Sequence, residues 1–248
     1  MDCTKPLVDE NGRMIKISDK YINLGYFCQL EAVVNKKMKM CEIYMYPEIR
    51  ILNETADNVK LVKKICKDAD KKKVQLLPIE INAEFPTHLA FIDNKVRLKA
   101  ILYKYFGTQY ESYLGKVNGT TIVSYIGGFL FDYPEKEIRG YYLRNYIFKN
   151  FPEEDQLALR EAEQNNAERY ALPEEIYTRR WEYLKQKDNF KGFDVWYNAI
   201  VEEALKEMKQ VSESEKFKTY AQVNAKKIIP FRYKDLIWPK VADLEDQN

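Results

Sequence analysis

The sequence predicts a predominantly helical α+β protein, with a mixed part over residues 1–133 and a helical part over residues 134–248. Apolar residues repeat at spacings of three and four over most of the chain, which is the period of a helix. Most of the short β-rich runs precede Pro134; after it only one remains, and signals for helix starts dominate. The 248 residues suffice for one large or two small domains. No flexible linker separates the two parts, so we expect one continuous body.

The N-terminal residues predict an arm, a helix and an edge strand. Residues 1–12 show no regular period and end on an Asn-Gly turn signal. Ser18 is a suitable N-cap for a helix over residues 19–35. Residues 38–51 alternate in polarity, and Pro47 interrupts the alternation, which predicts an edge strand or two short ones.

The next stretch predicts helix, strand and helix. Residues 55–72 carry an apolar stripe at helical spacing, formed by Val59, Val62 and Cys66. Residues 74–81 are rich in β-formers and are broken by Pro78. A second helical pattern extends over residues 86–106 and stops at Gly107.

Residues 113–133 predict an antiparallel hairpin. Asn118-Gly119 lies between β-forming residues, which is the strongest short-range signal for a tight hairpin turn. The β-branched run 121–126 follows, and Gly127-Gly128 predicts a second turn or a bulge.

After residue 133 the sequence predicts a series of helices. Prolines followed by acidic residues introduce helices near residues 135, 153 and 174, because proline suits the first turn and acids suit the positive end of the helix dipole. Further helices are expected from Asp194 and, after a Ser212-x-x-Glu215 capping box, over residues 213–228. Residues 239–248 are expected to form a tail.

Composition and charge limit the classes of function. Lys and Arg number 40 and Asp and Glu 38, so the formal net charge is +2. Along the chain, residues 1–75 carry +4, residues 76–135 carry −1 and residues 136–248 carry −1. A dedicated nucleic-acid binder shows a concentrated basic surplus, whereas a near-neutral chain suits a subunit that packs against copies or partners. We see no membrane span and no secretory signal, so we expect the protein in the cytoplasm or in an assembled particle.

Motifs for catalysis, metals and cofactors are absent from the sequence. There is a single histidine, His88, and the four cysteines are 25, 13 and 25 residues apart, which fits no Cys-x-x-Cys pattern. No phosphate-binding glycine loop or nucleophile elbow occurs. The acidic clusters stand at helix starts, where capping of the dipole explains them. We therefore expect no cofactor and no metal, and an enzyme with an unidentified carboxylate site remains an alternative.

The densest basic segment lies on one face of the helix predicted over residues 55–72. At 100° per residue, one side of this helix carries Lys60, Lys63, Lys64, Lys67 and Lys71. One interpretation is an ordinary solvated face, and the other is contact with phosphate or with an acidic partner. Lysine offers charge without bidentate recognition of bases, so nucleic-acid binding here would be independent of sequence.

Aromatic residues and arginines provide the candidate interface. The residues that we single out are Tyr141, Tyr142, Tyr146, Arg179, Arg180 and Trp181. Aromatic and arginine side chains are preferred anchors of protein interfaces. An ordinary aromatic core and base stacking are the competing interpretations.

These observations favour a non-enzymatic structural or assembly subunit of a large complex. The most specific form of this hypothesis is a virion component, such as a head–tail connector or tail-adaptor ring protein of a phage or virus. Its partners would be copies of itself or other structural proteins, with nucleic acid as a further possibility and no membrane. The alternative is a sequence-independent nucleic-acid-binding accessory protein of a phage or mobile element.

Overall fold

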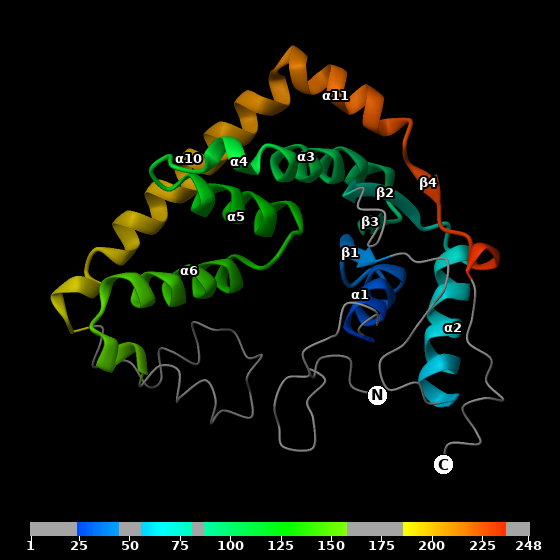
Figure 1. The fold of residues 1–248 in the computed structure, drawn as a ribbon, viewed down its shortest axis with the longest axis horizontal. Coiled ribbons are helices and arrows are strands. Elements are labelled where there is room, and N and C mark those ends of the chain that lie inside the picture. The colour runs from blue at the N-terminus through cyan, green and yellow to red at the C-terminus, as the bar shows by residue number, and fades with distance from the viewer. Residues whose placement is uncertain (1–23, 45–55, 81–86, 158–185, 237–248) are drawn as a thin grey trace. The chain divides into compact units, whose positions relative to one another are not determined.

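The computed structural model describes residues 24–44, 56–80, 87–157 and 186–236 (Figure 1). Contacts between residues divide the chain into two compact units. Unit 1 combines Met1–Thr108 with Glu215–Asn248, and unit 2 is Gln109–Ser214. The two units are defined by contacts between residues, whereas the predicted division at residue 133 is based on secondary-structure content. The division at residue 133 and the single continuous body therefore stay predictions.

Unit 1 contains a four-stranded antiparallel sheet in the order β1-β3-β2-β4. Its strands are β1 (Met40–Tyr44), β2 (Gln75–Glu80), β3 (Thr87–Phe91) and β4 (Ile229–Pro230). The register of β2 against β3 shifts between Pro78 and Glu80, where proline cannot donate a ladder hydrogen bond. β4 joins the sheet from the far end of the chain and pairs Leu76 with Ile229.

Helices cover both faces of this sheet. On one face, Cys41, Leu76 and Ala90 share a buried cluster with α1 (Leu24–Val34) and α2 (Ala56–Lys71). On the other face, α3 (Arg97–Thr108) reaches the sheet through Tyr103, whose hydroxyl donates to the Glu42 carboxylate. α11 (Glu215–Ala225) packs against α3 through Tyr105 and Phe217, whose ring centroids are 5.5 Å apart. The sheet is therefore the middle layer of unit 1 (Figure 1).

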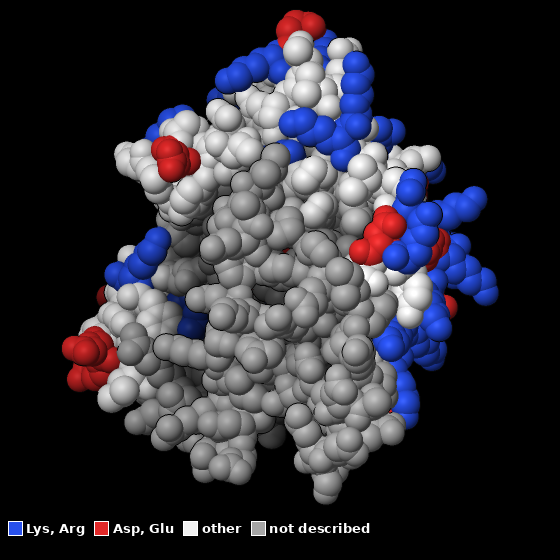
Figure 2. Space-filling model, turned by 45° about the vertical axis from the view of Figure 1, so that its right-hand side comes forward, with Lys and Arg blue, Asp and Glu red and all other residues white. Residues whose placement is uncertain are grey.

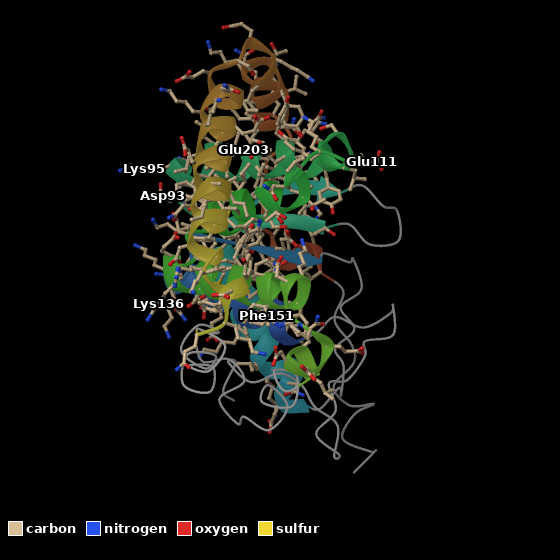
Figure 3. The ribbon with its side chains drawn as sticks, turned by 90° about the vertical axis from the view of Figure 1, so that its left-hand side faces the viewer. Asp93, Lys95, Glu111, Lys136, Phe151 and Glu203 are labelled. Carbon is tan, nitrogen blue, oxygen red and sulfur yellow. The ribbon has the colours of Figure 1, made fainter. Side chains whose placement is uncertain are left out.

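The start of α3 differs from the prediction of one helix over residues 86–106. Residues 87–91 form the central strand β3, and four of its five residues are buried. A short run that is buried on both faces of a sheet lacks the alternation that distinguishes a strand in sequence. The η1 turn (Asn94–Val96) then leads into α3, and the Asp93 side chain accepts a hydrogen bond from the backbone nitrogen of Lys95. Both side chains project outward (Figure 3).

Unit 2 is helical throughout its described residues. Its helices are α4 (Tyr110–Tyr113), α5 (Gly119–Leu130), α6 (Glu135–Asn150) and α10 (Phe193–Glu213), with the short turn η2 (Asp188–Phe190). The core is aromatic, since Tyr142 of α6 is 1% exposed and its ring centroid lies 5.6 Å from that of Tyr197 on α10. Tyr142 also donates a hydrogen bond to the backbone oxygen of Thr121 on α5.

The predicted hairpin over residues 113–133 is wrong, because most of this segment is helix α5. Of the Asn118-Gly119 pair only Asn118 has a left-handed conformation, with φ of 57°, and Gly119 is the first helical residue. A tight hairpin turn of type I′ would need positive φ at both positions. Ile122, Tyr125, Ile126 and Leu130 are buried at helical spacing, so burial outweighs the β propensity of the run.

The remaining helices agree with the sequence in type and nearly in extent. α1, α2, α6, α10 and α11 lie within a few residues of their predicted bounds, and the predominantly helical α+β class is confirmed. Most of the predicted helix over 174–187, the arm 1–12 and the tail 239–248 lie outside the described residues. Across the described part of the chain, no helix is both long and apolar enough to cross a membrane.

Candidate functional site

Positive charge concentrates on unit 1. Its residues include 26 Lys and Arg against 19 Asp and Glu, a net charge of +7, whereas unit 2 holds 14 against 19, a net charge of −5. The described residues of unit 1 alone carry 20 positive and nine negative side chains. This difference in net charge is not evident along the sequence, because unit 1 combines residues from both ends of the chain.

Helix α2 exposes the lysines that the sequence predicts on one face. Lys60, Lys64, Lys67 and Lys71 are exposed and Lys63 is half-buried, and together they form what we call the lysine face. The opposite side of α2 is buried through Val59, Val62, Ile65, Cys66 and Ala69. The amphipathic pattern of this helix is thus confirmed. What the lysine face contacts stays a prediction.

Some of these lysines have local partners. The Lys60 ammonium lies 3.7 Å from the Asp57 carboxylate in an exposed pair, which adds little stability in water. The Lys67 ammonium lies 5.4 Å from the centre of the Tyr233 ring. Neither contact removes the charge from the surface, because both lysine side chains remain exposed.

A second group of cations, far away in sequence, lies next to the end of α2. The backbone nitrogen of Tyr233 donates to Asp70 over 2.9 Å, and that of Phe231 donates to the Val74 oxygen over 2.8 Å. These bonds hold the η3 turn (Tyr233–Asp235) and β4 beside α2. The exposed cations brought here are Lys72 and Lys73 after the lysine face, and Arg232 and Lys234 from the C-terminal segment. With the lysine face they form the basic surface (Figure 2).

A groove of about 640 Å³ opens in the basic surface. Its described lining includes three cations, Lys73, Arg232 and Lys234. Its remaining lining is formed by Asp70, Gln75 and the segment Ile228–Phe231, in which Ile229 is 50% exposed. Asp70 already accepts the hydrogen bond from Tyr233. The groove therefore combines positively charged side chains with an apolar wall, which is formed by Ile228–Phe231.

Two other cations of unit 1 are engaged inside the fold. Arg97 donates to the backbone oxygen of Ala225 over 2.5 Å, which ties α3 to the end of α11. Lys104 is 8% exposed and donates to the backbone oxygen of Pro78 over 2.6 Å. Burial, and secondarily the positive charge of Lys227, lowers the pKa of Lys104. These two side chains position helices and are not part of the basic surface.

The aromatic interface candidates divide between the core and the surface of unit 2. Tyr142 and Tyr146 are 1% and 8% exposed and pack inside the unit, whereas Tyr141 is 49% exposed. Arg144 lies 4.9 Å from the centre of the Phe148 ring, and both are half-buried on the same side of α6 as Tyr141. Arg179, Arg180 and Trp181 lie outside the described residues.

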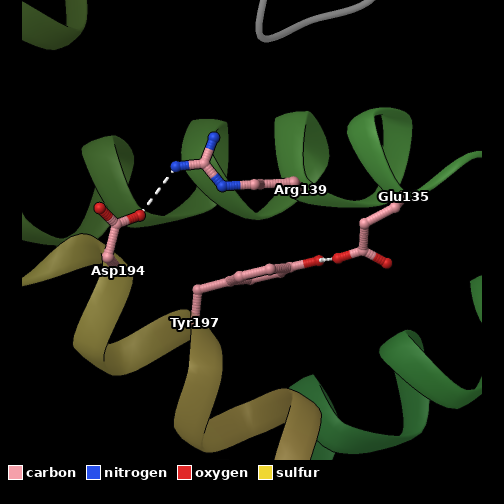
Figure 4. A network of polar contacts seen from close by, with 4 residues as sticks. All are labelled: Glu135, Arg139, Asp194 and Tyr197. Carbon is pink, nitrogen blue, oxygen red and sulfur yellow. Dashed lines mark hydrogen bonds and ion pairs between the residues drawn. The ribbon is translucent and has the colours of Figure 1, made fainter.

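A polar network joins α6 to α10 (Figure 4). Tyr197 donates its hydroxyl to Glu135, and Arg139 donates to Asp194 over 2.8 Å. The Arg139 guanidinium also lies 5.1 Å from the centre of the Phe193 ring. Burial, together with the neighbouring Glu135 carboxylate, raises the pKa of Tyr197 and of Tyr125. Each of the four side chains has a partner on the other helix, so this network stabilises the packing of α6 against α10.

Two cysteines and the single histidine, residue types that often serve in catalysis or metal binding, lie in unit 1. Cys41 and Cys66 are buried, and burial raises the pKa of Cys66 to about 12. His88 lies on the central strand β3 and is half-buried. Within the described ranges, no three His, Cys, Asp or Glu side chains gather in a metal-binding group. Among the described residues that line the groove, Asp70 is the single carboxylate, and the alternative of an enzyme with a carboxylate site stays a prediction.

Comparison with known proteins gives no relative from which a function could be transferred: no family model, no curated protein and no solved structure matches the chain. The functional argument therefore depends on the geometry of the chain itself.

Proposed function

We propose that the protein binds nucleic acid without sequence specificity, through contacts between the basic surface of unit 1 and backbone phosphates. The observation that carries the proposal is the concentration of positive charge on one unit, +7 against −5 on the other. A one-sided basic surface is the electrostatic footprint of a nucleic-acid binder.

The dimensions of the lysine face suit a phosphate backbone. Lys60 and Lys71 are eleven residues apart, so the face extends for about 16 Å at 1.5 Å per residue. Double-stranded DNA carries one charge per about 1.7 Å of its axis, or about ten charges over that length. Several ammonium groups can therefore each meet a phosphate at the same time.

The side chains of the basic surface explain why binding would not depend on the base sequence of the nucleic acid. Eight of the nine cations are lysines, and Arg232 is the exception. An ammonium is a point charge on a flexible stem, whereas bidentate recognition of guanine depends on the planar fork of arginine. Phosphate contacts of this kind fix position and affinity but carry no base information.

Salt dependence separates this proposal from an ordinary solvated helix face. If about four lysines each release a counterion, log K falls with log salt at a slope of about −4, so affinity drops by about 250-fold between 50 and 200 mM salt. We expect this slope in fluorescence anisotropy titrations with labelled duplexes of two unrelated sequences, and equal affinity for both.

Matched charge variants test the location of the site. Lys60→Gln, Lys64→Gln and Lys71→Gln combined should reduce the salt slope by about 3 and weaken binding at 100 mM salt at least tenfold. The control combines three exposed lysines of unit 2, Lys149→Gln, Lys206→Gln and Lys209→Gln. It should change affinity less than twofold. Failure of the wild-type protein to bind at 50 mM salt, or equal effects of both variants, would contradict the proposal.

We propose, as a second candidate, that the protein is an assembly subunit whose partner is a copy of itself. The favouring observation is the exposed side of α6, where Tyr141 is 49% exposed beside the Arg144–Phe148 pair. Tyrosine, phenylalanine and arginine are enriched at protein interfaces. The most specific form, a head–tail connector or tail-adaptor ring of a phage or virus, requires a closed oligomer.

Light scattering across a concentration series tests this second candidate. A defined oligomer that the Tyr141→Glu variant dissociates, and that a control Tyr110→Glu variant leaves intact, would support it. Tyr110 is a suitable control because it is 42% exposed on α4. A monodisperse monomer at every concentration and at two salt levels would contradict self-assembly.

A further inference from the structure

We infer that the groove in the basic surface binds a single strand of nucleic acid, with its phosphates at the groove cations and its bases against the apolar wall. This inference rests on the proposed function and names the form of nucleic acid that the site selects. It is carried by the placement of Lys73, Arg232 and Lys234 around exposed apolar residues.

The groove is held open by backbone pairing. Leu76 and Gln75 of β2 pair with Ile229 and Pro230 of β4, and the next residue, Phe231, is 2% exposed and donates its backbone N–H to Val74. Ile229 and Pro230 are thereby exposed on a fixed strand. The site is built on sheet pairing rather than on side-chain positions alone, which favours a preformed ligand site.

The three cations at the groove are available to a ligand. Lys73, Arg232 and Lys234 are exposed, and none of them forms an ion pair with another described residue. Among the described lining residues Asp70 is the one carboxylate, and it accepts the hydrogen bond from the Tyr233 backbone. The groove therefore keeps a positive surplus, which attracts an anionic ligand.

The apolar wall distinguishes a single strand from a duplex. In a duplex, the flat faces of the bases are stacked inside the helix, so only phosphates and groove edges could reach this surface. In a single strand, the bases are free to lie against apolar and arginine side chains while the phosphates follow the cations. The combination of Ile229, Pro230 and Arg232 suits the second ligand.

The size and position of the groove agree with this ligand. Its volume of about 640 Å³ falls within the range of roughly 300–1,000 Å³ that is typical of ligand pockets. Tyr233 connects it to the lysine face, because its ring lies 5.4 Å from the Lys67 ammonium. A strand that leaves the groove can therefore continue along α2.

The test compares single-stranded and double-stranded ligands on the full-length protein. The probes are a labelled 20-nucleotide oligothymidylate and a labelled 20-base-pair duplex, titrated at the same salt concentration. Arg232→Gln with Lys234→Gln should weaken binding of the single strand at least tenfold and of the duplex less than threefold. Ile229→Ser, which removes only apolar surface, should weaken the single strand at least threefold and leave the duplex unchanged.

Two controls match these variants within unit 1. Lys37→Gln with Lys216→Gln removes the same charge from exposed positions outside the groove, and Val223→Ser removes an apolar side chain that is 51% exposed on α11. Both should reduce single-strand affinity less than twofold. Circular dichroism melts of all variants confirm that the fold is retained.

The possible outcomes separate the inference from the proposed function. If the groove variants weaken both ligands equally, the selection of single strands is overturned while nucleic-acid binding stands. If the wild-type protein binds neither probe, both fail. If a 20-residue polyglutamate displaces the oligothymidylate as well as unlabelled oligothymidylate does, the groove is an acidic-peptide site and the inference is overturned.

Discussion

Tyr197 on α10 donates its hydroxyl to the Glu135 carboxylate at the start of α6, and this bond connects two helices that are about sixty residues apart in sequence. Tyr197 is 3% exposed whereas Glu135 is an exposed residue, so the bond lies at the edge of the core. Tyr125 on α5 also reaches Glu135. The Glu135 carboxylate thus joins α6 to α10 and lies near Tyr125 of α5, and removing the carboxylate or the Tyr197 hydroxyl should lower the stability of the protein.

Tyr197→Phe should destabilise the protein by about 1–3 kcal/mol, the range for hydrogen bonds to charged groups. The ring and its packing are retained, so the change isolates the hydroxyl. Urea denaturation followed by circular dichroism gives the free energy of unfolding. The control is Tyr141→Phe, whose side chain is half-exposed. It should have an effect within about 0.5 kcal/mol, as surface changes do. Equal effects of the two substitutions would contradict the role of the bond.

Two glycines in helices should respond in opposite directions to alanine. A Cβ at Gly119 would lie 2.2 Å from the backbone oxygen of Tyr113, so Gly119→Ala requires a backbone shift. We expect a loss of more than about 3 kcal/mol, which is the range of severe steric mechanisms. At Gly107 of α3 no atom lies within 4 Å of such a Cβ. Gly107→Ala should stabilise the protein by up to about 1 kcal/mol because alanine is the better helix former.

Thermal melting of both glycine variants under the same conditions checks this pair. Should Gly119→Ala be too unstable to purify, its soluble yield relative to that of Gly107→Ala is the readout. Comparable melting temperatures for the two variants would show that the close approach of Gly119 to Tyr113 does not occur.

The sequence was sufficient for features that depend on local periodicity. The exposed lysines of α2 follow from a stripe of apolar residues at helical spacing, and a helix places the intervening lysines opposite that stripe. The strand β2 likewise coincides with its predicted run. In both cases the burial pattern of neighbouring residues specifies the element.

Features that depend on distant contacts could not be predicted in the same way. Asn118-Gly119 is a turn signal in either a hairpin or a helix start, and the choice depends on whether Ile122 and Ile126 find a partner helix. The groove joins Lys73 to Arg232, which are more than 150 residues apart, through the pairing of β2 with β4. Neither segment has a periodic pattern that indicates this pairing. The sequence therefore predicted the lysines of α2 but not the cations that the C-terminal segment adds to the basic surface.

The thiols of Cys41 and Cys66 should resist labelling in the folded protein. Burial raises the pKa of Cys66 from 9.0 to about 12, which lowers its thiolate fraction near neutral pH by about a thousandfold. The pKa of Cys41 is raised further by burial and by the nearby Glu42. Peptide mapping after brief treatment with iodoacetamide at pH 8 should find Cys28, which is partly exposed, modified before either of them. Labelling of all three at one rate without denaturant would contradict the buried placement.

Alkaline pH should destabilise the protein in a defined order. A buried thiol or phenol whose folded pKa is raised stays protonated in the native state while the unfolded chain loses its proton. The stability contributed by the neutral group is therefore complete below the unfolded pKa and is lost as pH rises towards the folded pKa. The unfolded value is 9.0 for Cys41 and Cys66 in unit 1, and 10.0 for Tyr125, Tyr142 and Tyr197 in unit 2.

The free energy of unfolding should accordingly change little from these groups below pH 9 and then fall, first through the thiols and then through the phenols. Each fully buried group contributes a slope of up to about 1.4 kcal/mol per pH unit above its unfolded pKa. Urea denaturation at pH 8, 9.5 and 10.5 measures the fall. Cys66→Ala removes one titrating thiol, so it should lower overall stability but reduce the slope between pH 9 and 10. An unchanged slope in that variant, or stability that rises with pH, would contradict the burial of these groups.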